Sequence, residues 1–309
     1  MSALSGHVDD YLRLRRALGF QLIQPGNVLP RFVAWLDDRG ETTITVDAAL
    51  TWTRLSQNVA QITLSHRLGA IRGFAHYMHT IDPVTEIPPE GIFGKQQRQA
   101  PYIYTQEEIT ALLDAASQLR SPLRAATYRT LLALLAATGM RVGEAFRLAQ
   151  ADVDLAGELM TIRHTKFDRD RLVPLHPSVT ELLNDYATCR DRLSPPTGST
   201  RFFVSIKGTA LRSSAVSITF SKLLAAAKIP ATASGRVPRM ADLRHTFAVE
   251  TLIGWQRERL DVTSRLPVLS TYLGHVSPAS TYWYLEAVPE LMQHTAARLE
   301  AHTQLRTET

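Results

Sequence analysis

The chain has 309 residues, of which 45% are hydrophobic and 20% charged, and 34 Lys and Arg against 29 Asp and Glu give it a formal charge of +5 at pH 7. This length favours two domains, and this composition is typical of a globular protein rather than a disordered one. The sequence lacks an apolar run of the ~18–20 residues that a transmembrane helix needs. Its single cysteine, Cys189, excludes an internal disulfide and a cysteine-based zinc site.

The N-terminus and the type of basic residue give two further indications. The residues MSALSGHVDD contain no basic region followed by an apolar run, so we expect no signal peptide and a cytoplasmic location. Arginine dominates the basic residues, and its planar guanidinium suits phosphate because it donates two parallel hydrogen bonds. A sequence pI of about 9.5 is compatible with a polyanionic partner but does not prove one, because a solvated, mildly basic surface also explains it.

The N-terminal third of the sequence is predicted to be helical. Four segments have the pattern of helices, namely residues 8–18, 28–36, 45–55 and 64–78. The polar side of the last segment carries basic side chains, which are His66, Arg67, Arg72, His76 and His79. Two interpretations of this face remain open: a solvated helix surface, and a surface that lies against DNA phosphates.

A change in pattern marks the end of this third. Residues 87–99 show no periodicity, begin with prolines and end in a polar run, which is the composition of a linker. A helix then begins at Thr105, which forms a capping-box pattern with Glu108. We therefore predict an N-terminal domain over 1–88, a linker over 89–103 and a second domain over 104–309. Residues 1–100 hold 10 Lys and Arg against 9 Asp and Glu, so most of the positive excess lies in the second domain.

The second domain is predicted to be mainly helical with a small β-sheet. A strongly apolar helix over 124–138 ends before Gly139, a residue type that commonly follows a helix. Two short strands, 159–163 and 172–175, flank a polar turn at 165–170 and predict a hairpin. The remaining predicted helices cover 178–190, where Ser178 and Glu181 form a second capping box, then 214–227, 242–254, 268–273 and 278–285, and an amphipathic stretch over 289–301.

Three stretches of this domain stand out for their arginine, histidine and tyrosine residues. They are TGMRVGEAFRL at 138–148, DLRHTFA at 242–248 and LGHVSPASTYWY at 273–284. In the first stretch, Gly139 ends one helix and Arg141 begins the next. A rigid junction would therefore hold this guanidinium while its head faces outward.

In this order and spacing, the three stretches resemble the boxes of the tyrosine recombinase family, the site-specific DNA recombinases of the phage integrase type. The first resembles the first arginine box, the second resembles the second arginine box, and the third resembles the Leu-Gly-His box with its downstream tyrosine. The resemblance covers about residues 100–290, extends less specifically to the N-terminal helices, and includes transposon-borne integrases. It implies an N-terminal helical core-binding (SAM-like) domain and an α/β catalytic domain, and hence a mainly α fold with a small β-sheet.

The resemblance also implies an enzyme that cleaves and rejoins DNA through a 3′-phosphotyrosine intermediate, and it assigns five catalytic residues. Arg141 and Arg244 would neutralise the two non-bridging phosphate oxygens, in contacts that strengthen as charge develops in the transition state. Tyr284 would attack phosphorus, and the covalent intermediate would keep the bond energy for rejoining. Lys166, on the hairpin turn, would protonate the leaving 5′ oxygen, and His275 would hydrogen-bond the phosphate.

Each of these five side chains also has a structural alternative. The alternatives are an ion pair of Arg141 with Glu144, an ion pair of Arg244 with Asp242 or Glu250, a solvated Lys166, a helix cap by His275 and aromatic packing by Tyr284. Tyr282 competes as the nucleophile, but two residues subtend roughly 200° on a helix, so only one of the two tyrosines can face the site. The spacing from His275 favours Tyr284.

One position departs from the family's pattern. The family usually has a histidine three residues before its second arginine, whereas this chain has Ala241, which cannot carry a proton. Arg239 and His245 are the nearby candidates to replace it, although the family position of His245 is usually structural. Because general acid–base help is worth roughly 10²–10⁴-fold in rate, we expect reduced but real cleavage. The alternative is a catalytically impaired relative that binds DNA as an accessory to sister recombinases.

Other mechanisms fit the sequence less well, and we expect neither a cofactor nor a metal. A two-metal nuclease needs about three converging carboxylates, but Asp168 and Asp170 lie in a turn flanked by arginines without a partner motif. No phosphate-binding Gly-x-x-x-x-Gly-Lys-[Ser/Thr] loop is present, which argues against the use of ATP. A type IB topoisomerase would share the chemistry, but its boxes differ.

The expected partners are double-stranded DNA and further copies of the chain. By resemblance, the two domains form a C-shaped clamp around the duplex, and four protomers assemble as a tetramer on two DNA sites. The tail after Tyr284 has an apolar face, made by Leu291, Met292, Ala296 and Leu299. This face would dock on a neighbouring protomer or, alternatively, pack within its own chain. We expect no membrane association, and a location at the nucleoid in the bacterial cytoplasm.

Overall fold

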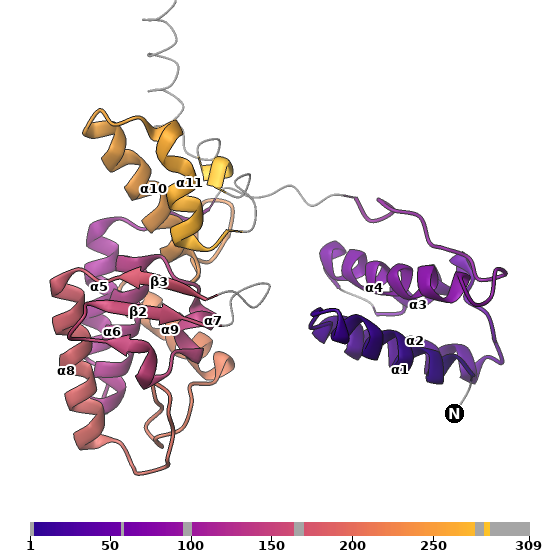
Figure 1. Ribbon diagram of the computed structural model, residues 1–309, viewed down its shortest axis with the longest axis horizontal. Helices are drawn as coiled ribbons and strands as arrows, with labels where there is room; N and C mark the ends of the chain where they lie inside the picture. The colour runs from indigo at the N-terminus through magenta and orange to yellow at the C-terminus, as the bar shows by residue number, and fades with distance from the viewer. Residues whose placement is uncertain (1–2, 57–58, 95–100, 164–169, 276–280, 285–309) are drawn as a thin grey trace, which may run out of the picture. The chain divides into compact units, whose positions relative to one another are not determined.

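The computed structural model describes residues 3–56, 59–94, 101–163, 170–275 and 281–284. The chain divides into two compact units, residues 1–99 and 100–309, which can be followed by colour in Figure 1. The point of division falls within the segment 89–103 that has the composition of a linker. In the described ranges, no helix is both long and apolar enough to cross a bilayer.

The described part of the first unit consists of four helices, which are α1 (Ala3–Ala17), α2 (Ile23–Asp38), α3 (Val46–Arg54) and α4 (Gln61–His79). Each matches a predicted helix, but α1, α2 and α4 begin before the first residue of the apolar pattern. In α2 the extra turn contains Pro25, which is tolerated because the first turn of a helix needs no backbone N–H donor. Phe32 of α2 and Phe74 of α4 are fully buried, so these helices form the core of the unit.

Two basic side chains on the polar face of α4 are used within the first unit. Arg72 donates to the carbonyl oxygens of Pro88 and Pro89, both at 2.7 Å. Nδ1 of His79 is hydrogen-bonded to the carbonyl of Thr85, also at 2.7 Å. These contacts fasten the segment that follows α4 against the helix. Arg72 and His79 therefore have an intramolecular role. On this face, the open alternative of contact with DNA phosphates concerns mainly the other basic side chains.

The described part of the second unit contains helices and one small antiparallel sheet. Its helices are α5 (Gln106–Ser117), α6 (Pro122–Thr138), α7 (Val142–Arg147), the 3₁₀ helix η1 (Gln150–Asp152), α8 (Pro177–Leu193), α9 (Ser213–Ala226), α10 (Asp242–Arg257) and α11 (Val262–Leu273). The sheet has the order β1 (Val153–Asp154), β2 (Leu159–Ile162) and β3 (Arg171–Pro174). Met160 pairs with Val173 across β2 and β3, which confirms the predicted hairpin and the mainly helical fold with a small sheet.

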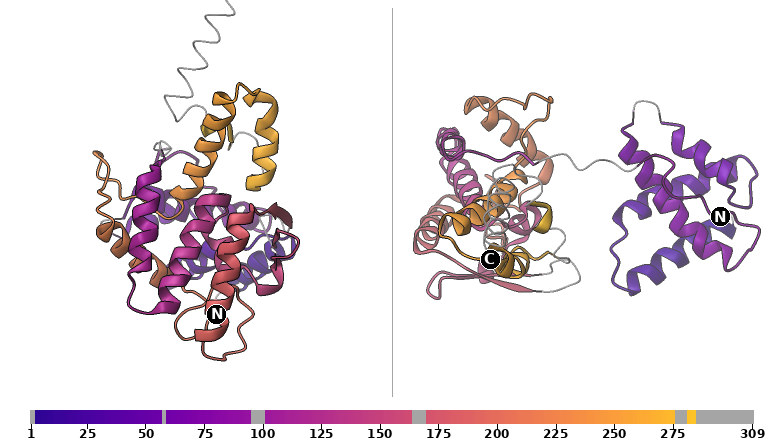
Figure 2. Two further views of the ribbon diagram at one scale, coloured as in Figure 1. Left: turned by 90° about the vertical axis from the view of Figure 1, so that its left-hand side faces the viewer. Right: turned by 90° about the horizontal axis from the view of Figure 1, so that it is seen from above.

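Helix α6 is the centre of the second unit. It packs against α5, α8 and α10, and Figure 2 shows α5, α6 and α8 side by side. Leu131, Leu134 and Leu135 are buried by these neighbours, as the apolar sequence of α6 predicts. The helix ends at Gly139, whose φ of 59° lies in the left-handed region that glycine adopts readily. A Cβ atom at this position would overlap the ring of Phe247 on α10.

The starts of α5 and α8 differ in how well local sequence predicts them. The predicted capping box at Thr105 is present at the start of α5. The predicted box of Ser178 and Glu181 is wrong, because α8 begins earlier, at Pro177, with His176 as its N-cap. Proline suits the first position of a helix, where a backbone N–H would lack a partner in any case. Nδ1 of His176 accepts the N–H of Ser178 at 3.3 Å and so completes this cap.

Helix α11 starts at Val262 rather than at the predicted residue 268. It contains Pro267, and a proline in a helix interior removes a backbone hydrogen bond. The carboxylate of Asp261 caps the new start by accepting a backbone N–H at 3.0 Å, and apolar packing of Leu266 in a cluster with α10 residues offsets the lost bond. Helices α10 and α11 and the helical residues 281–284 lie together at one end of the unit (Figure 1).

Candidate active site

Arg141 lies at the junction of α6 and α7, directly before the first residue of α7. Its Nη1 donates to Oε1 of Glu144 at 2.8 Å, and its Nη2 donates to the carbonyl of Gly274 at 2.8 Å. The ion pair that was the structural alternative for Arg141 is therefore present, and the same guanidinium also reaches the Leu-Gly-His stretch. The side chain is 37% exposed, so part of the guanidinium faces solvent.

Glu144 is a buried carboxylate that two arginines share. Its side chain is 2% exposed, and Arg171 donates to both of its oxygens, at 3.1 and 2.7 Å. Burial alone would raise the pKa of Glu144, but the hydrogen bonds and charges of Arg171 and Arg141 outweigh burial and lower this pKa to about 2. Arg171 is absent from the residues predicted above. The signal that could have found it is its position two residues before the buried Val173, which places both on the inward face of β3.

Arg244 links the first and third stretches from its position on α10. It is 8% exposed, and its Nη1 and Nη2 donate to the carbonyls of Gly139 at 2.9 Å and Leu273 at 2.7 Å. Burial, followed by the charge of Arg141, lowers the pKa of Arg244 to about 10. The guanidinium therefore remains charged at pH 7, and all three stretches meet at this side chain.

The ion pair that would give Arg244 a structural role is absent from the part of the chain that the structure describes. The buried carboxylate of Asp242 instead receives Arg236 at 2.6 Å and Arg239 at 3.3 Å, and Glu250 is exposed at the surface of α10. The recorded acceptors of Arg244 are backbone carbonyls, so within these residues no carboxylate forms an ion pair with it, and the charge of Glu144 acts on it without direct contact.

His275 follows Gly274, whose φ of 67° ends α11. Nδ1 of His275 is hydrogen-bonded to Oγ1 of Thr281 at 2.7 Å, so this side chain contacts the following helical residues rather than capping α11. Its ring stacks on that of Tyr284, with 6.2 Å between the centroids. Burial, with nearby arginine charge, lowers the pKa of His275 to about 3, and the imidazole is therefore neutral at pH 7.

The two tyrosines of the third stretch point to different surroundings. Tyr282 is 44% exposed, whereas Tyr284 is 2% exposed. The hydroxyl of Tyr284 lies 3.0 Å from Nδ1 of His245, and its ring packs against His245, His275 and Trp283. Aromatic packing, the structural alternative for Tyr284, is thus present. The same packing brings the Tyr284 hydroxyl, and not that of Tyr282, to the second stretch.

Several predicted features lie outside the described residues. Lys166 falls within 164–169, the helix start at Ser277 and Pro278 falls within 276–280, and the amphipathic stretch 289–301 falls within 285–309. The hairpin strands on either side of Lys166 are described, as are the helical residues 281–284. Ala241, where the chain departs from the family's pattern, is exposed directly before α10.

Among the described residues, the site is a cluster of positive charge. Arg141 and Arg171 share one carboxylate, that of Glu144, and the third guanidinium, that of Arg244, is held by backbone carbonyls. An anion beside these groups would meet donors that are already held in place. In the same residues, no group of three or more His, Cys, Asp and Glu side chains is arranged to hold a metal ion. The arrangement is suited to binding a phosphate beside a phenol.

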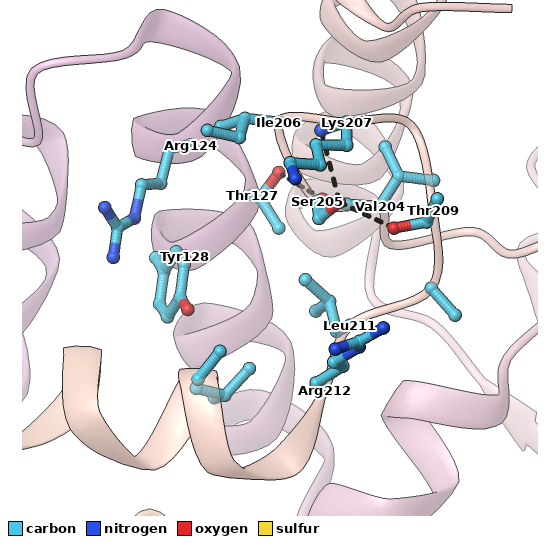
Figure 3. Close-up of a pocket in the computed structure, with 13 residues that line it drawn as sticks. Arg124, Thr127, Tyr128, Val204, Ser205, Ile206, Lys207, Thr209, Leu211 and Arg212 are labelled. Carbon is cyan, nitrogen blue, oxygen red and sulfur yellow. Dashed lines mark hydrogen bonds between the residues drawn. The ribbon is translucent and has the colours of Figure 1, made fainter. Parts of the chain in front are cut away.

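A cavity of about 460 Å³ lies elsewhere in the second unit (Figure 3). Arg124 and Tyr128 of α6 line one side of it, and Ile206, Lys207 and Leu211 reach it from the segment before α9. Along α6, Tyr128 is about 15 Å from the end at which the arginines gather. The cavity shares no lining residue with the arginine cluster and is therefore a separate feature.

Sequence comparisons identify relatives over most of the chain. The profile of the phage integrase family matches residues 103–291. A putative integrase/recombinase of Sinorhizobium fredii, y4rB, is 38% identical over 314 residues, which cover 99% of this chain and 100% of that protein. The tyrosine recombinase XerC of Chlamydia caviae is 26% identical over 81% of this chain and 75% of its own length.

Solved structures have the same fold. The Tn1549 transposon integrase in complex with transposon right end DNA matches with a TM-score of 0.67 at 14% identity, over 97% of this chain and 100% of that one. A lambda integrase dimer bound to a COC′ core site matches with a TM-score of 0.63 at 17% identity, over 91% of this chain and 94% of that one. The family profile covers more than half of the chain, and the full-length relative agrees with it. The chain therefore belongs to the phage integrase family of tyrosine recombinases.

Proposed function

We propose that this chain is a site-specific DNA recombinase that cleaves and rejoins duplex DNA through a 3′-phosphotyrosine intermediate on Tyr284. The observation that carries the proposal is the convergence of three stretches that are far apart in the sequence. Arg244 of the second stretch donates to carbonyls of the first and the third, and Tyr284 of the third lies against His245 of the second. Membership of the phage integrase family supports the same reaction.

In this proposal, Arg141 and Arg244 bind the scissile phosphate. Backbone carbonyls hold both guanidiniums, so their orientation is set before DNA arrives. Preorganised donors of this kind stabilise the transition state as negative charge builds on the non-bridging oxygens. Nδ1 of neutral His275 is hydrogen-bonded to the Thr281 hydroxyl; in this proposal Nδ1 is the acceptor, and the ring proton on Nε2 adds a further donor.

Tyr284 and Lys166 carry out the proposed bond exchange. The phenolic oxygen of Tyr284 attacks phosphorus, and the bond from phosphorus to the 5′ oxygen breaks. Lys166, which lies in the sequence between β2 and β3, protonates that leaving oxygen. The DNA 3′-phosphate is then joined to Tyr284, and a 5′ hydroxyl can attack this linkage in the reverse sense. Rejoining needs no ATP because the covalent intermediate conserves the energy of the broken bond.

The proposed partners are double-stranded DNA and further copies of the chain. Two of the structural relatives support this: one is a transposon integrase in complex with transposon DNA, and the other is an integrase dimer on a core site. The net positive charge of the chain is compatible with a phosphate-rich partner. We infer that the protein serves a mobile element, assembles on paired DNA sites and associates with the bacterial nucleoid.

Ala241 supports a second candidate function. A methyl side chain cannot exchange protons, so the position where the family usually has a histidine contributes no acid–base help here. If no other group replaces it, the chain would bind a recombination site without cutting it. Its role would then be that of an accessory factor for sister recombinases.

Trapping of the covalent adduct distinguishes the two functions. The substrate is a pool of duplexes with a randomised core. Each duplex has a nick a few nucleotides to the 3′ side of the reacting phosphate. Cleavage then releases a short fragment that carries the new 5′ hydroxyl, rejoining is prevented, and the covalent protein–DNA complex accumulates. We expect wild type and Tyr282→Phe, the matched control, to form the adduct, and Tyr284→Phe to form none. Mass spectrometry would locate the DNA on Tyr284. Tight DNA binding without any wild-type adduct would favour the accessory function, and an adduct in Tyr284→Phe would refute the assignment of the nucleophile.

A further inference from the structure

The hydroxyl of Tyr284 has a specific neighbour on α10. It lies 3.0 Å from Nδ1 of His245, with 5.6 Å between the ring centroids. Trp283 packs edge-on against the same imidazole at 5.7 Å, and Tyr284 itself is 2% exposed. The contact is therefore sheltered from water and is held from two elements, α10 and the helical residues 281–284.

The other ring nitrogen of His245 faces a buried carboxylate. Nε2 lies 3.9 Å from Oδ1 of Asp242, one turn earlier on α10, and Asp242 is 0% exposed. This distance is too long for a hydrogen bond, but the negative charge favours the tautomer that carries its proton on Nε2. A neutral imidazole has one donor and one acceptor, so Nδ1 then presents a lone pair to the Tyr284 hydroxyl. The order carboxylate, imidazole, hydroxyl is the arrangement by which an adjacent base activates a nucleophile.

The surroundings keep His245 able to accept a proton at pH 7. Burial lowers the pKa of His245 to about 4 against the opposing charge of Asp242, and Arg244, Arg239 and Arg236 lower it as well. Burial and the nearby arginines lower the pKa of His275 to about 3, so this second imidazole is also neutral at pH 7. A bound phosphate would bring negative charge to Arg244 and so raise the pKa of His245 at the moment when a base is needed.

Helix geometry explains how residue 245 can serve in place of residue 241. Residues four apart lie one turn apart on the same face of a helix. Ala241 directly precedes α10 and continues its backbone conformation, so His245 lies one turn beyond it on that face. Arg239, the other candidate, is bound to Asp242 and is 65% exposed. Among the three positions considered, His245 is the one with a recorded contact to the phenolic oxygen.

We propose that His245 is a catalytic residue of this chain and that its Nδ1 accepts the phenolic proton of Tyr284 as the phenolic oxygen attacks phosphorus. The inference rests on the proposed function. The bond from the phenolic oxygen to phosphorus forms, the bond from phosphorus to the 5′ oxygen breaks, and the leaving oxygen takes its proton from Lys166. The resulting imidazolium faces Asp242. In the rejoining step, Nδ1 returns the proton to the phenolic oxygen while the 5′ hydroxyl displaces it.

The test compares two His245 variants on two versions of the duplex recovered from the adduct-trapping pool. One version has the natural 5′ oxygen at the scissile position, and the other has sulfur there, which leaves without being protonated. His245→Ala removes the contact, and His245→Gln keeps an acceptor that can orient the phenol but cannot take its proton. His176→Gln, at the exposed N-cap of α8, is the matched control. The readout is the single-turnover rate of adduct formation, with DNA affinity and thermal midpoint measured in parallel.

We expect both His245 variants to slow adduct formation by about 10²–10⁴-fold on both duplexes, with DNA affinity and thermal midpoint retained. Sulfur should rescue Lys166→Ala but not the His245 variants, because the proton that His245 handles belongs to the nucleophile. The variants should gain about tenfold in rate per pH unit between pH 6 and 9, as phenolate becomes available, whereas wild type should stay nearly flat. His176→Gln should keep the wild-type rate on both duplexes.

Four outcomes would overturn the inference. A His245→Gln rate within threefold of wild type would mean that His245 only orients the phenol. Rescue of the His245 variants by sulfur would mean that His245 helps to protonate the leaving oxygen and does not accept the phenolic proton. Wild-type rates in both variants would leave His245 without a role in the reaction. A wild-type protein that forms no adduct in the trapping pool would refute the proposed function itself, and that result differs from the other three because no variant is needed to obtain it.

Discussion

Replacing Glu144 by glutamine tests whether its carboxylate holds the arginine cluster together. Glu144→Gln keeps the size of the side chain but removes the charge that Arg141 and Arg171 share at 2.8 and 2.7 Å. The pKa of Glu144 is lowered from 4.5 to about 2, and this difference corresponds to about 3 kcal/mol in favour of the ionised form. Because the side chain is 2% exposed, solvent screens little of this energy. We therefore expect the variant to lose about 3 kcal/mol of unfolding free energy at pH 7, which lowers the thermal midpoint of the second unit by about 6–12 °C.

The pH dependence of this loss follows from the direction of the pKa shift. A carboxyl whose folded-state pKa is lowered contributes its stability above the unfolded pKa and loses it as the pH falls through the folded one. For Glu144 this window runs from 4.5 down to about 2. The difference between wild type and Glu144→Gln should therefore be constant above pH 5.5 and shrink below 4.5. The lowered pKa values of His245 and His275 also reduce stability in acid, but they act on both proteins and cancel in the difference.

Native-state hydrogen exchange in urea is the suitable assay, because peptides from α6 and α10 report the unfolding of the second unit separately from the first. The matched control is Glu181→Gln, on the exposed face of α8, for which we expect a change within about 0.5 kcal/mol. Equal stability of Glu144→Gln and wild type at pH 7 would refute the reasoning. A large difference that stays constant down to pH 2 would refute the electrostatic part of it.

Three further predictions concern the backbone at Gly274, the DNA contacts and the tail. Gly274→Ala should lower the free energy of unfolding by about 1–3 kcal/mol, because φ is 67° and the new Cβ would lie 2.8 Å from Nη1 of Arg171. The control is Gly254→Ala, on a helix where the new Cβ would have no neighbouring atom within 4 Å. In thermal unfolding, this control should be neutral or up to about 1 kcal/mol stabilising. DNA affinity measured against salt should fall with a log–log slope of about −0.9 per phosphate neutralised, and a flat profile would argue against a phosphate-binding site. Truncation after Ala287 should weaken assembly on two DNA sites while single-site binding in a mobility-shift assay persists; a truncated protein that still pairs two sites would show that the tail packs within its own chain.

Local signals in the sequence predict the elements of the second unit well where a clear pattern extends over a few neighbouring residues. The apolar run of α6 and its terminal glycine, the two strands of the hairpin and the capping box at Thr105 all appear as expected. They depend on periodicity and on interactions over a few residues, which a single sequence displays. The start of α8 shows the limit of such signals, because two capping patterns overlap there and Pro177 decides between them.

The interior of the site could not be predicted in the same way. Arg244 donates to carbonyls of residues that lie 105 and 29 positions away, and any residue type can supply a carbonyl. Arg171 reaches Glu144 because β3 turns its side chain inward, which becomes visible once the strand register is known. The contact of His245 with Tyr284 likewise depends on how residues 281–284 pack against α10. The three stretches of sequence contain most of the residues of the site, whereas the contacts among these residues depend on tertiary packing.

The structural and catalytic interpretations of Arg141 are compatible, because one arginine has enough N–H donors for both roles. A guanidinium has five N–H donors in a fixed plane, and Arg141 directs bonds from Nη1 to Glu144 and from Nη2 to Gly274. The partly exposed side chain keeps further N–H groups for a ligand. The ion pair with Glu144 fixes the plane of the guanidinium and hence the direction of those remaining donors. Glu144→Gln should accordingly weaken both folding and phosphate binding, whereas loss of a purely structural ion pair would affect folding alone.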